Sequence, residues 1–325
     1  MAPRPGSAAR PDDLGSRRPA ETAMRFLVII PTFDHGRTIE FAIRSILHQS
    51  HRNLELAVIA DGSPPHTHDL VRHFAAKDAR VRLHVFPKGA GNGDAWRHEV
   101  LSAAQADAVA YCGDDDIWGP QHLKALAGLL RDADFAHTRH VMIAPNLAIR
   151  AIDETPADAA VRRRMIDELW NCFGPTCAGH RLDAYRRLPD GWSPGPPGVA
   201  SDLNMWRKFL SQAWVRVASS KAATTLKLAS PERSGWDETR RTQESRLVHD
   251  LFLDRAMWRA LAETLPDGHV PVPLPTVVNR AIEIARGRPG GDASGGRGAG
   301  GRGAGTKRPG AWSPAALWRR LTGRR

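Results

Sequence analysis

Several features that mark other protein classes are scarce in this chain of 325 residues. It has three cysteines, Cys112, Cys172 and Cys177, and no CxxC pair. We therefore expect neither a disulfide framework nor a structural zinc site. No run of about 18 apolar residues occurs, which excludes a membrane-spanning helix, and residues 1–23 contain no apolar segment of a secretory signal. These absences predict a protein of the reducing cytoplasm.

The net charge of +11 is concentrated at one end of the chain. Residues 286–325 hold ten Arg or Lys and one Asp, residues 1–24 carry +1, and +1 is left for residues 25–285. A nearly neutral body gives no reason to expect a specific nucleic-acid partner. The end of the basic tail, residues 312–325, has two interpretations: a solvated tail, or a short amphipathic helix that attaches the protein peripherally to the inner membrane face.

Hydrophobic periodicity divides the chain into two folded halves between two disordered ends. Residues 1–23 and the Gly/Arg-rich residues 286–325 lack periodicity and are predicted to be disordered. Residues 24–130 alternate four apolar runs (25–31, 54–60, 81–86 and 108–112) with helical patterns, which predicts an α/β fold with a mostly parallel central sheet and helices on both faces. In residues 131–285 we expect a strand over 135–143, helices from 182 and 201, and one long helix over 238–265.

Carboxylates follow three of the predicted strands. Asp34, Asp61 and the run Asp114–Asp116 each come just after an apolar run. Ligands of parallel sheets bind at the carboxyl ends of strands, so these acids are expected along one edge. Three adjacent carboxylates repel one another, and a divalent cation such as Mg²⁺ or Mn²⁺ would compensate their charge. The alternative is an acidic loop that only caps the following helix.

The glycine-rich segment 88–93 is not a known phosphate-binding signature. No GK[ST] follows it, and no GxGxxG follows the first strand, which disfavours a dinucleotide-binding fold and a nucleotidyltransferase. Lys88 and Arg97 flank the glycines. They either meet phosphate or are solvated charges beside a flexible turn.

Four segments in fixed order resemble a known family. They are PTFD at 31–34, AIRSILHQ at 42–49, DGS at 61–63 and DDDIW at 114–118. In order and spacing the chain is similar to the GT-A-fold glycosyltransferases of family 2, strongly over residues 25–130 and more weakly to about residue 215. It departs from the family pattern at Ala60, Gly113 and His98, and Asp34 stands where the family has Asn.

The resemblance implies a Rossmann-like GT-A fold and an inverting, Mg²⁺- or Mn²⁺-assisted transfer of a sugar from a nucleotide diphosphate sugar. It assigns residues 24–130 to nucleotide-sugar binding and residues 131–285 to a smaller acceptor-binding half with C-terminal helices. The nucleotide (UDP, GDP or dTDP) and the acceptor (glycan, lipid or protein) stay open. By position, the roles carried over are nucleotide contacts for Thr32, Asp34 and Arg97, a hydrogen bond to the base for Asp61, ribose or metal contact for Asp114, and metal binding for Asp115.

In the second half the resemblance assigns the catalytic base to Asp202. A carboxylate there would take the proton of the acceptor hydroxyl. The alternative is helix capping, with Ser201 as N-cap and a helix dipole that lowers the pKa of Asp202. His180 and Trp206 are weaker candidates for contact with the acceptor or diphosphate, and core packing is the alternative for both. Because Ala60 and Gly113 depart from the pattern, a nucleotide- or glycan-binding module without turnover is the second functional hypothesis.

Overall fold

The structure is a computed structural model that describes residues 23–287. The predictions made for residues 1–22 and 288–325, including disorder and membrane contact of the basic tail, lie outside the described residues. Within the described range, no helix combines the length and the apolar character needed to cross a bilayer.

The first half (residues 24–130) contains the predicted parallel sheet. Its strands are β1 (Phe26–Thr32), β2 (Leu54–Asp61), β3 (Val81–Phe86) and β4 (Ala108–Tyr111), in the spatial order β4-β1-β2-β3. The helices between and after them are α1 (Ile39–Leu47), α2 (Pro65–Ala75), α3 (Asp94–Ala103) and α4 (His122–Leu129), with the short 3-10 helix η1 (Gly36–Thr38) before α1.

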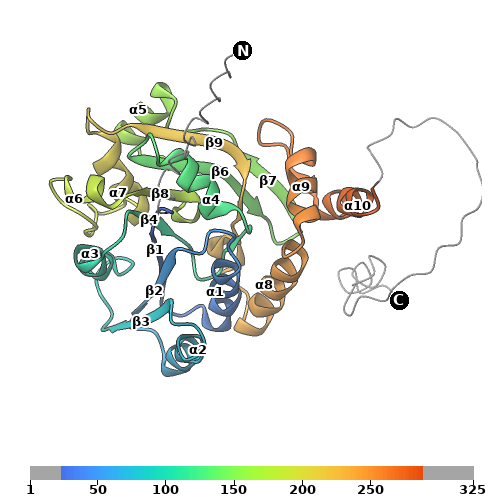
Figure 1. Cartoon of the computed structure of the whole chain (residues 1–325), viewed down its shortest axis with the longest axis horizontal. Helices are drawn as coiled ribbons and strands as arrows, with labels where there is room; N and C mark the ends of the chain where they lie inside the picture. Colours follow the sequence, from blue (N-terminus) through green and yellow to red (C-terminus); the bar gives the residue numbers. More distant parts are fainter. Residues whose placement is uncertain (1–22, 288–325) are drawn as a thin grey trace, which may run out of the picture.

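Both faces of this sheet are buried because β1 is apolar at nearly every position. Phe26, Val28 and Ile30 pack with α1, α2 and α4, whereas Leu27 and Ile29 pack with the helices of the opposite face. The sheet therefore carries helices on both sides, as predicted (Figure 1). Since β4, β1 and β2 are parallel neighbours, their carboxyl ends share one edge.

The second half (residues 131–285) extends the sheet with mixed pairing. Strand β8 (Ala178–Arg181) runs antiparallel between β4 and β6 (Phe135–Ile143) and so joins the two halves. Further strands are β7 (Ala148–Ile152), β9 (Val217–Ala223), β11 (Val272–Pro273) and the separate pair β5 (Ile117–Trp118) and β10 (Thr225–Leu226). Shorter helices are α5 (Ala159–Asp167), η2 (Pro175–Cys177), α6 (Leu182–Arg186), α7 (Ser201–Leu210) and η3 (Ser230–Arg233).

The predicted single helix over residues 238–265 is wrong. The segment forms α8 (Glu238–Phe252) and α9 (Arg255–Thr264), because Asp254 leaves the helical conformation and its side chain accepts a hydrogen bond from the backbone N–H of Ala256. A last helix, α10 (Leu274–Ala285), packs beside α9 at the edge of the molecule (Figure 1). These three helices cover β6 and β7 through a separate apolar cluster.

Candidate functional site

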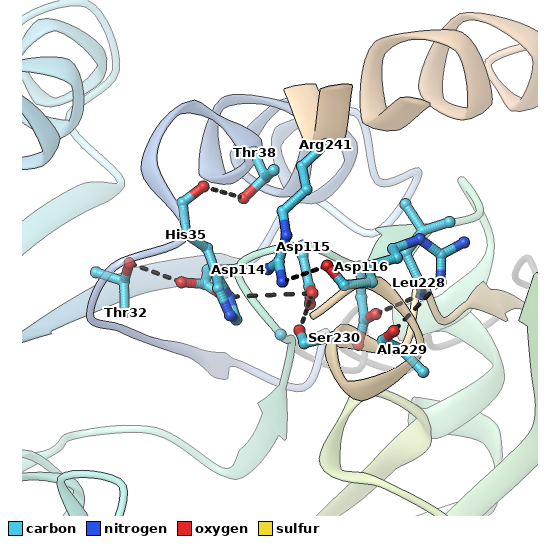
Figure 2. A network of polar contacts seen from close by, with 12 residues as sticks. Thr32, His35, Thr38, Asp114, Asp115, Asp116, Leu228, Ala229, Ser230 and Arg241 are labelled. Atoms are coloured by element: carbon cyan, nitrogen blue, oxygen red, sulfur yellow. Dashed lines mark hydrogen bonds and ion pairs between the residues drawn. The ribbon is translucent and has the colours of Figure 1, made fainter. Parts of the chain in front are cut away.

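The first carboxylate of the acidic turn meets the end of β1. The Thr32 hydroxyl donates to Asp114 Oδ2 at 2.7 Å, and His35 Nδ1 lies 2.6 Å from Asp114 Oδ1 (Figure 2). Thr32 and Asp114 are 82 residues apart in the chain. The expected gathering of strand ends on one edge is confirmed for this pair.

The second carboxylate has the least compensation. Asp115 Oδ2 lies 3.9 Å from His35 Nδ1 and accepts a hydrogen bond from the Ser230 hydroxyl of η3. Burial and the charges of Asp116 and Asp114 raise the pKa of Asp115 to about 6, while the hydrogen bond to Asp114 raises the pKa of His35 to about 9. Burial and the neighbouring carboxylates thus disfavour the ionised form of Asp115, and a bound cation would offset both effects.

One group of ligand atoms in the described part of the chain has the spacing of a metal site. His35, Asp114 and Asp115 each offer one atom, and the three atoms lie within 4.8 Å of one another. Two carboxylates and one imidazole are donors that Mn²⁺ and related divalent ions accept. The residues therefore fit the metal that the resemblance implies.

The third carboxylate turns away from this group. Asp116 is fully buried and accepts hydrogen bonds from Leu228 N (3.0 Å), Lys227 Nζ (3.4 Å) and the Thr176 hydroxyl. The same ion pair raises the pKa of Lys227. Asp116 is thus the buried anchor of the turn. The capping alternative is wrong, since the N-cap of α4 is Gln121 and no side chain caps that helix.

The Gly113 departure from the family pattern has a steric cause. A Cβ at Gly113 would lie 2.7 Å from Asp116 Oδ2 and 3.3 Å from Asp115 Oδ1. Because Lys227 and Leu228 hold the Asp116 carboxylate against position 113, a side chain at that position has no room. Ala60, the other departure, is fully buried in β2.

The Asp61 side chain is buried and holds the glycine-rich segment through hydrogen bonds. Its carboxylate accepts hydrogen bonds from Gly89 N at 2.6 Å and Lys88 Nζ at 2.5 Å. Gly93 has φ of +74°, and a Cβ there would lie 2.9 Å from Asp61 Cγ. The segment therefore wraps around Asp61. Lys88 forms an ion pair with Asp61, which neither interpretation of Lys88 includes, and its contact with phosphate stays a prediction. Asp34 is exposed, and a nucleotide contact of either acid stays a prediction.

Arg97 lies inside a network that connects α3 to the start of α7. Its Nη1 donates to Asp94 Oδ1 at 2.7 Å, its guanidinium stacks over Trp192 at 4.5 Å, and the Ser201 hydroxyl donates to the same Asp94 oxygen. Arg97 is only 5% exposed. Its charge lies near Asp202 and Asp61 as well as Asp94, but a direct phosphate contact of Arg97 stays a prediction.

Asp202 is a half-buried carboxylate in the first turn of α7. The N-cap of α7 is Ala200, so the expected N-cap role of Ser201 is wrong. The expected lowering of the Asp202 pKa is also wrong, because burial raises it against the opposing effects of Lys227 and Arg97. Lys227 favours the ionised forms of both Asp115 and Asp202, so its charge connects Asp202 with the acidic turn.

His180 and Trp206 lie in the aromatic core. His180 is fully buried, with Nε2 2.7 Å from the Tyr111 hydroxyl and Nδ1 3.0 Å from the Arg181 carbonyl, and burial lowers its pKa to about 4. Trp206 is also fully buried and packs edge-on against Phe135. These surroundings favour the packing alternative for both residues.

Several site residues had no part in the sequence prediction. They are His35, Thr176, Lys227, Ser230 and Arg241, the last of which points from α8 toward the acidic turn (Figure 2). His35 directly follows Asp34, so the rule that selected strand ends could have found it. The other four lie in the second half, far from any motif, and no pattern marks them.

The family model of glycosyl transferase family 2 matches residues 27–188, from the start of β1 past β8. The chain belongs to this family.

Three curated relatives show how far the likeness extends. TuaG of Bacillus subtilis, a glycosyltransferase provisionally assigned to teichuronic acid biosynthesis, is 29% identical over 71% of this chain and 91% of its own length. An uncharacterized glycosyltransferase of Nostoc sp. is 26% identical over 50% of this chain, and the match covers 51% of that relative's own length. The UDP-Glc:α-D-GlcNAc-diphosphoundecaprenol β-1,3-glucosyltransferase WfgD of Escherichia coli is 33% identical over 28% of this chain and 35% of its length.

Among solved structures, TarS of S. aureus in complex with UDP aligns with a TM-score of 0.47 at 18% identity. The alignment covers 81% of this chain and 71% of that one.

Proposed function

We propose that this protein transfers a sugar from a nucleotide diphosphate sugar to an acceptor hydroxyl, with inversion at the anomeric carbon. Asp114 and Asp115 hold a divalent cation, Thr32, Asp34, Asp61 and Arg97 line the nucleotide side, and Asp202 is the general base. When bound, the cation supplies positive charge to the departing nucleotide diphosphate.

This proposal rests on the different surroundings of two carboxylates in the acidic turn, Asp115 and Asp116. Asp116 forms an ion pair with the half-buried Lys227, whereas Asp115 keeps a raised pKa and faces Asp114 and His35. The uncompensated charge therefore stands where a metal-bound diphosphate can satisfy it. Arg241, which points to the same place, adds a second cation for an anionic donor (Figure 2).

Asp202 suits the base role for a reason of environment. Its raised pKa makes the carboxylate more basic than a solvated one, while Lys227 and Arg97 still favour the ionised form. A general base works best when its pKa approaches the working pH and it remains ionised there. In an inverting reaction this carboxylate takes the hydroxyl proton as the acceptor oxygen attacks the sugar carbon.

The test compares Asp202→Asn with the wild type for sugar transfer and for nucleotide affinity. We expect transfer to fall by about 10²- to 10⁴-fold with UDP affinity unchanged, because the amide cannot accept the proton but keeps the shape. Asp183→Asn is the matched control, since Asp183 is exposed on α6 and forms an ion pair with Arg181. Full transfer by Asp202→Asn would remove Asp202 from the base role.

The donor must be identified before that assay can be run. The E. coli relative is named for UDP-glucose, which makes UDP-glucose the first donor to try. A thermal-shift screen of UDP, GDP and dTDP, each with and without Mn²⁺, ranks the nucleotides by the stabilisation that binding supplies.

The second candidate function is a nucleotide-binding module without turnover. The buried Ala60 and the side-chain-free Gly113 favour it, since both remove a carboxylate of the family pattern. A protein that binds one of the nucleotides tightly and hydrolyses or transfers none of the corresponding sugars would favour the module over the enzyme.

A further inference from the structure

His35 occupies a place that the family pattern does not assign. It lies in the loop between β1 and η1, and its Nδ1 faces two carboxylates, Asp114 Oδ1 at 2.6 Å and Asp115 Oδ2 at 3.9 Å. The third side chain of the candidate metal cluster is therefore a nitrogen donor from another strand end.

The two separations between His35 and the carboxylates are close to the spacing of ligands around one ion. Ligand bonds of about 2.1 Å place neighbouring ligand atoms about 3 Å apart and opposite ones about 4.2 Å apart in an octahedral site. The 3.9 Å separation of His35 and Asp115 lies within this range, and the 2.6 Å hydrogen bond to Asp114 would open by a few tenths of an ångström. Little movement of His35 Nδ1 is therefore required for it to share a cation with either carboxylate.

We propose that His35 Nδ1 is a protein ligand of the divalent cation together with Asp114 and Asp115, and that this nitrogen makes the site prefer Mn²⁺ to Mg²⁺. Mg²⁺ strongly prefers oxygen ligands, whereas first-row transition ions accept imidazole nitrogen. The inference rests on the cation of the proposed function but says which ion it is and which side chain selects it.

The loop that carries His35 is held in place from two sides. The Thr38 hydroxyl donates to the His35 carbonyl at 3.0 Å instead of capping α1, and Arg37 N donates to Glu238 Oε1 of α8 at 2.9 Å. Gly36 has φ of +62°, and a Cβ there would collide with the Glu238 side chain. A ligand on a backbone fixed in this way loses little conformational entropy when it binds a metal.

Electron spin-echo measurements on the Mn²⁺-loaded protein test the proposal directly. With Mn²⁺ alone and with Mn²⁺ plus UDP, we expect ¹⁴N modulation from one imidazole in the wild type and none in His35→Asn. Asn can place one polar amide atom where Nδ1 stands, either a donor to Asp114 or an oxygen for the metal, but it offers no imidazole nitrogen. Because the chain has 14 histidines, His73→Gln, on the exposed face of α2, is the matched control and should keep the signal.

Metal affinity gives a second readout that does not depend on catalysis. We expect His35→Ala to weaken Mn²⁺ binding by about tenfold or more and Mg²⁺ binding by less than about threefold. Unchanged Mn²⁺ affinity, or nitrogen modulation that persists without His35, would overturn the proposal and leave His35 as a charged partner of Asp114. Circular dichroism of each variant checks that it is folded.

The two proposals fail in different ways. A protein that binds Mn²⁺ through His35 but transfers no sugar would overturn the proposed function and keep this inference. A protein that transfers sugar equally well with Mg²⁺ and Mn²⁺, and shows no nitrogen ligand, would overturn this inference and keep the proposed function.

Discussion

The two halves of the molecule deliver their site residues in different ways. In the first half Thr32, His35, Asp61 and Asp114 all lie at or just after the carboxyl end of a parallel strand. In the second half the residues come from a helix start (Asp202), 3-10 turns and loops. The topology of a parallel sheet places the carboxyl ends of its strands on one edge, independently of the loop sequences. Turns and helix starts reach that edge only through tertiary packing.

The acidic turn shows what each half contributes. The first half supplies the three carboxylates. The second half supplies the donors to Asp115 and Asp116, which are the Lys227 ammonium, the Thr176 and Ser230 hydroxyls and the Leu228 N–H. The charge of Asp116 is satisfied entirely from the second half, whereas Asp114 is held by first-half residues. The second half thus determines which carboxylates remain available for a cation.

The largest effect on stability is expected from Asp116→Ala. Removal of a fully buried carboxylate leaves Lys227 without its partner and two further donors, Thr176 and Leu228, unpaired, which costs about 3–5 kcal/mol. Urea unfolding with the metal removed by EDTA measures the change. A cost below about 1 kcal/mol would mean that the second half does not anchor the turn.

Asp115→Asn should act in the opposite direction, because the raised pKa of Asp115 shows that its charge destabilises the folded state. Without metal we expect the variant to be as stable as the wild type or more stable by about 1–3 kcal/mol, with at least tenfold weaker Mn²⁺ binding. The same urea series reports stability, and titration calorimetry reports affinity. Similar destabilisation by Asp115→Asn and Asp116→Ala would erase the distinction between the two carboxylates.

The pH dependence of sugar transfer distinguishes the role of Asp202 in the second half from the role of the metal site in the first half. Asp202 must be ionised to accept a proton, and burial raises its pKa. The rate should therefore fall on the acid side at a pH above the ordinary carboxyl range of about 4. UDP binding measured over the same pH range is the control, because loss of the metal would weaken binding and transfer together. If UDP binding falls in parallel with the transfer rate, the loss of rate at low pH comes from the metal-binding carboxylates of the first half and not from Asp202.

Ser201→Ala tests the link between the halves at α7. The Ser201 hydroxyl donates to Asp94, which also pairs with Arg97, so this contact joins α3 to the helix start that carries Asp202. We expect a loss of about 1 kcal/mol in stability and a fall in kcat on the order of tenfold with unchanged UDP affinity. Ser193→Ala removes a hydroxyl from the same half that bonds Asp190 and Lys208 instead, and should leave kcat unchanged.

The same contrast explains what could be predicted from the sequence. The four parallel strands and the position of Asp114 at their carboxyl edge followed from apolar runs and strand-end acids, because local pattern and topology determine both, whereas Thr32 was expected at the site only from the family resemblance. The second-half partners of Asp115 and Asp116 lie between 60 and 115 residues away in the chain, and no local pattern encodes such contacts. The pKa of Asp202 was predicted with the wrong sign because burial depends on packing, whereas the helix dipole can be read from the sequence.

The break between α8 and α9 gives the smallest expected effect. The pattern over residues 238–265 predicts one helix, but Asp254 has an extended backbone and its side chain accepts from Ala256 N at 2.8 Å. An Asp within a helical pattern competes for backbone N–H groups and often marks a new start. Asp254→Ala should cost about 1 kcal/mol and leave UDP binding unchanged, measured by thermal unfolding and calorimetry. Because α9 packs on α10 away from the acidic turn, a change in nucleotide affinity would show that the C-terminal helices shape the site as well as the fold.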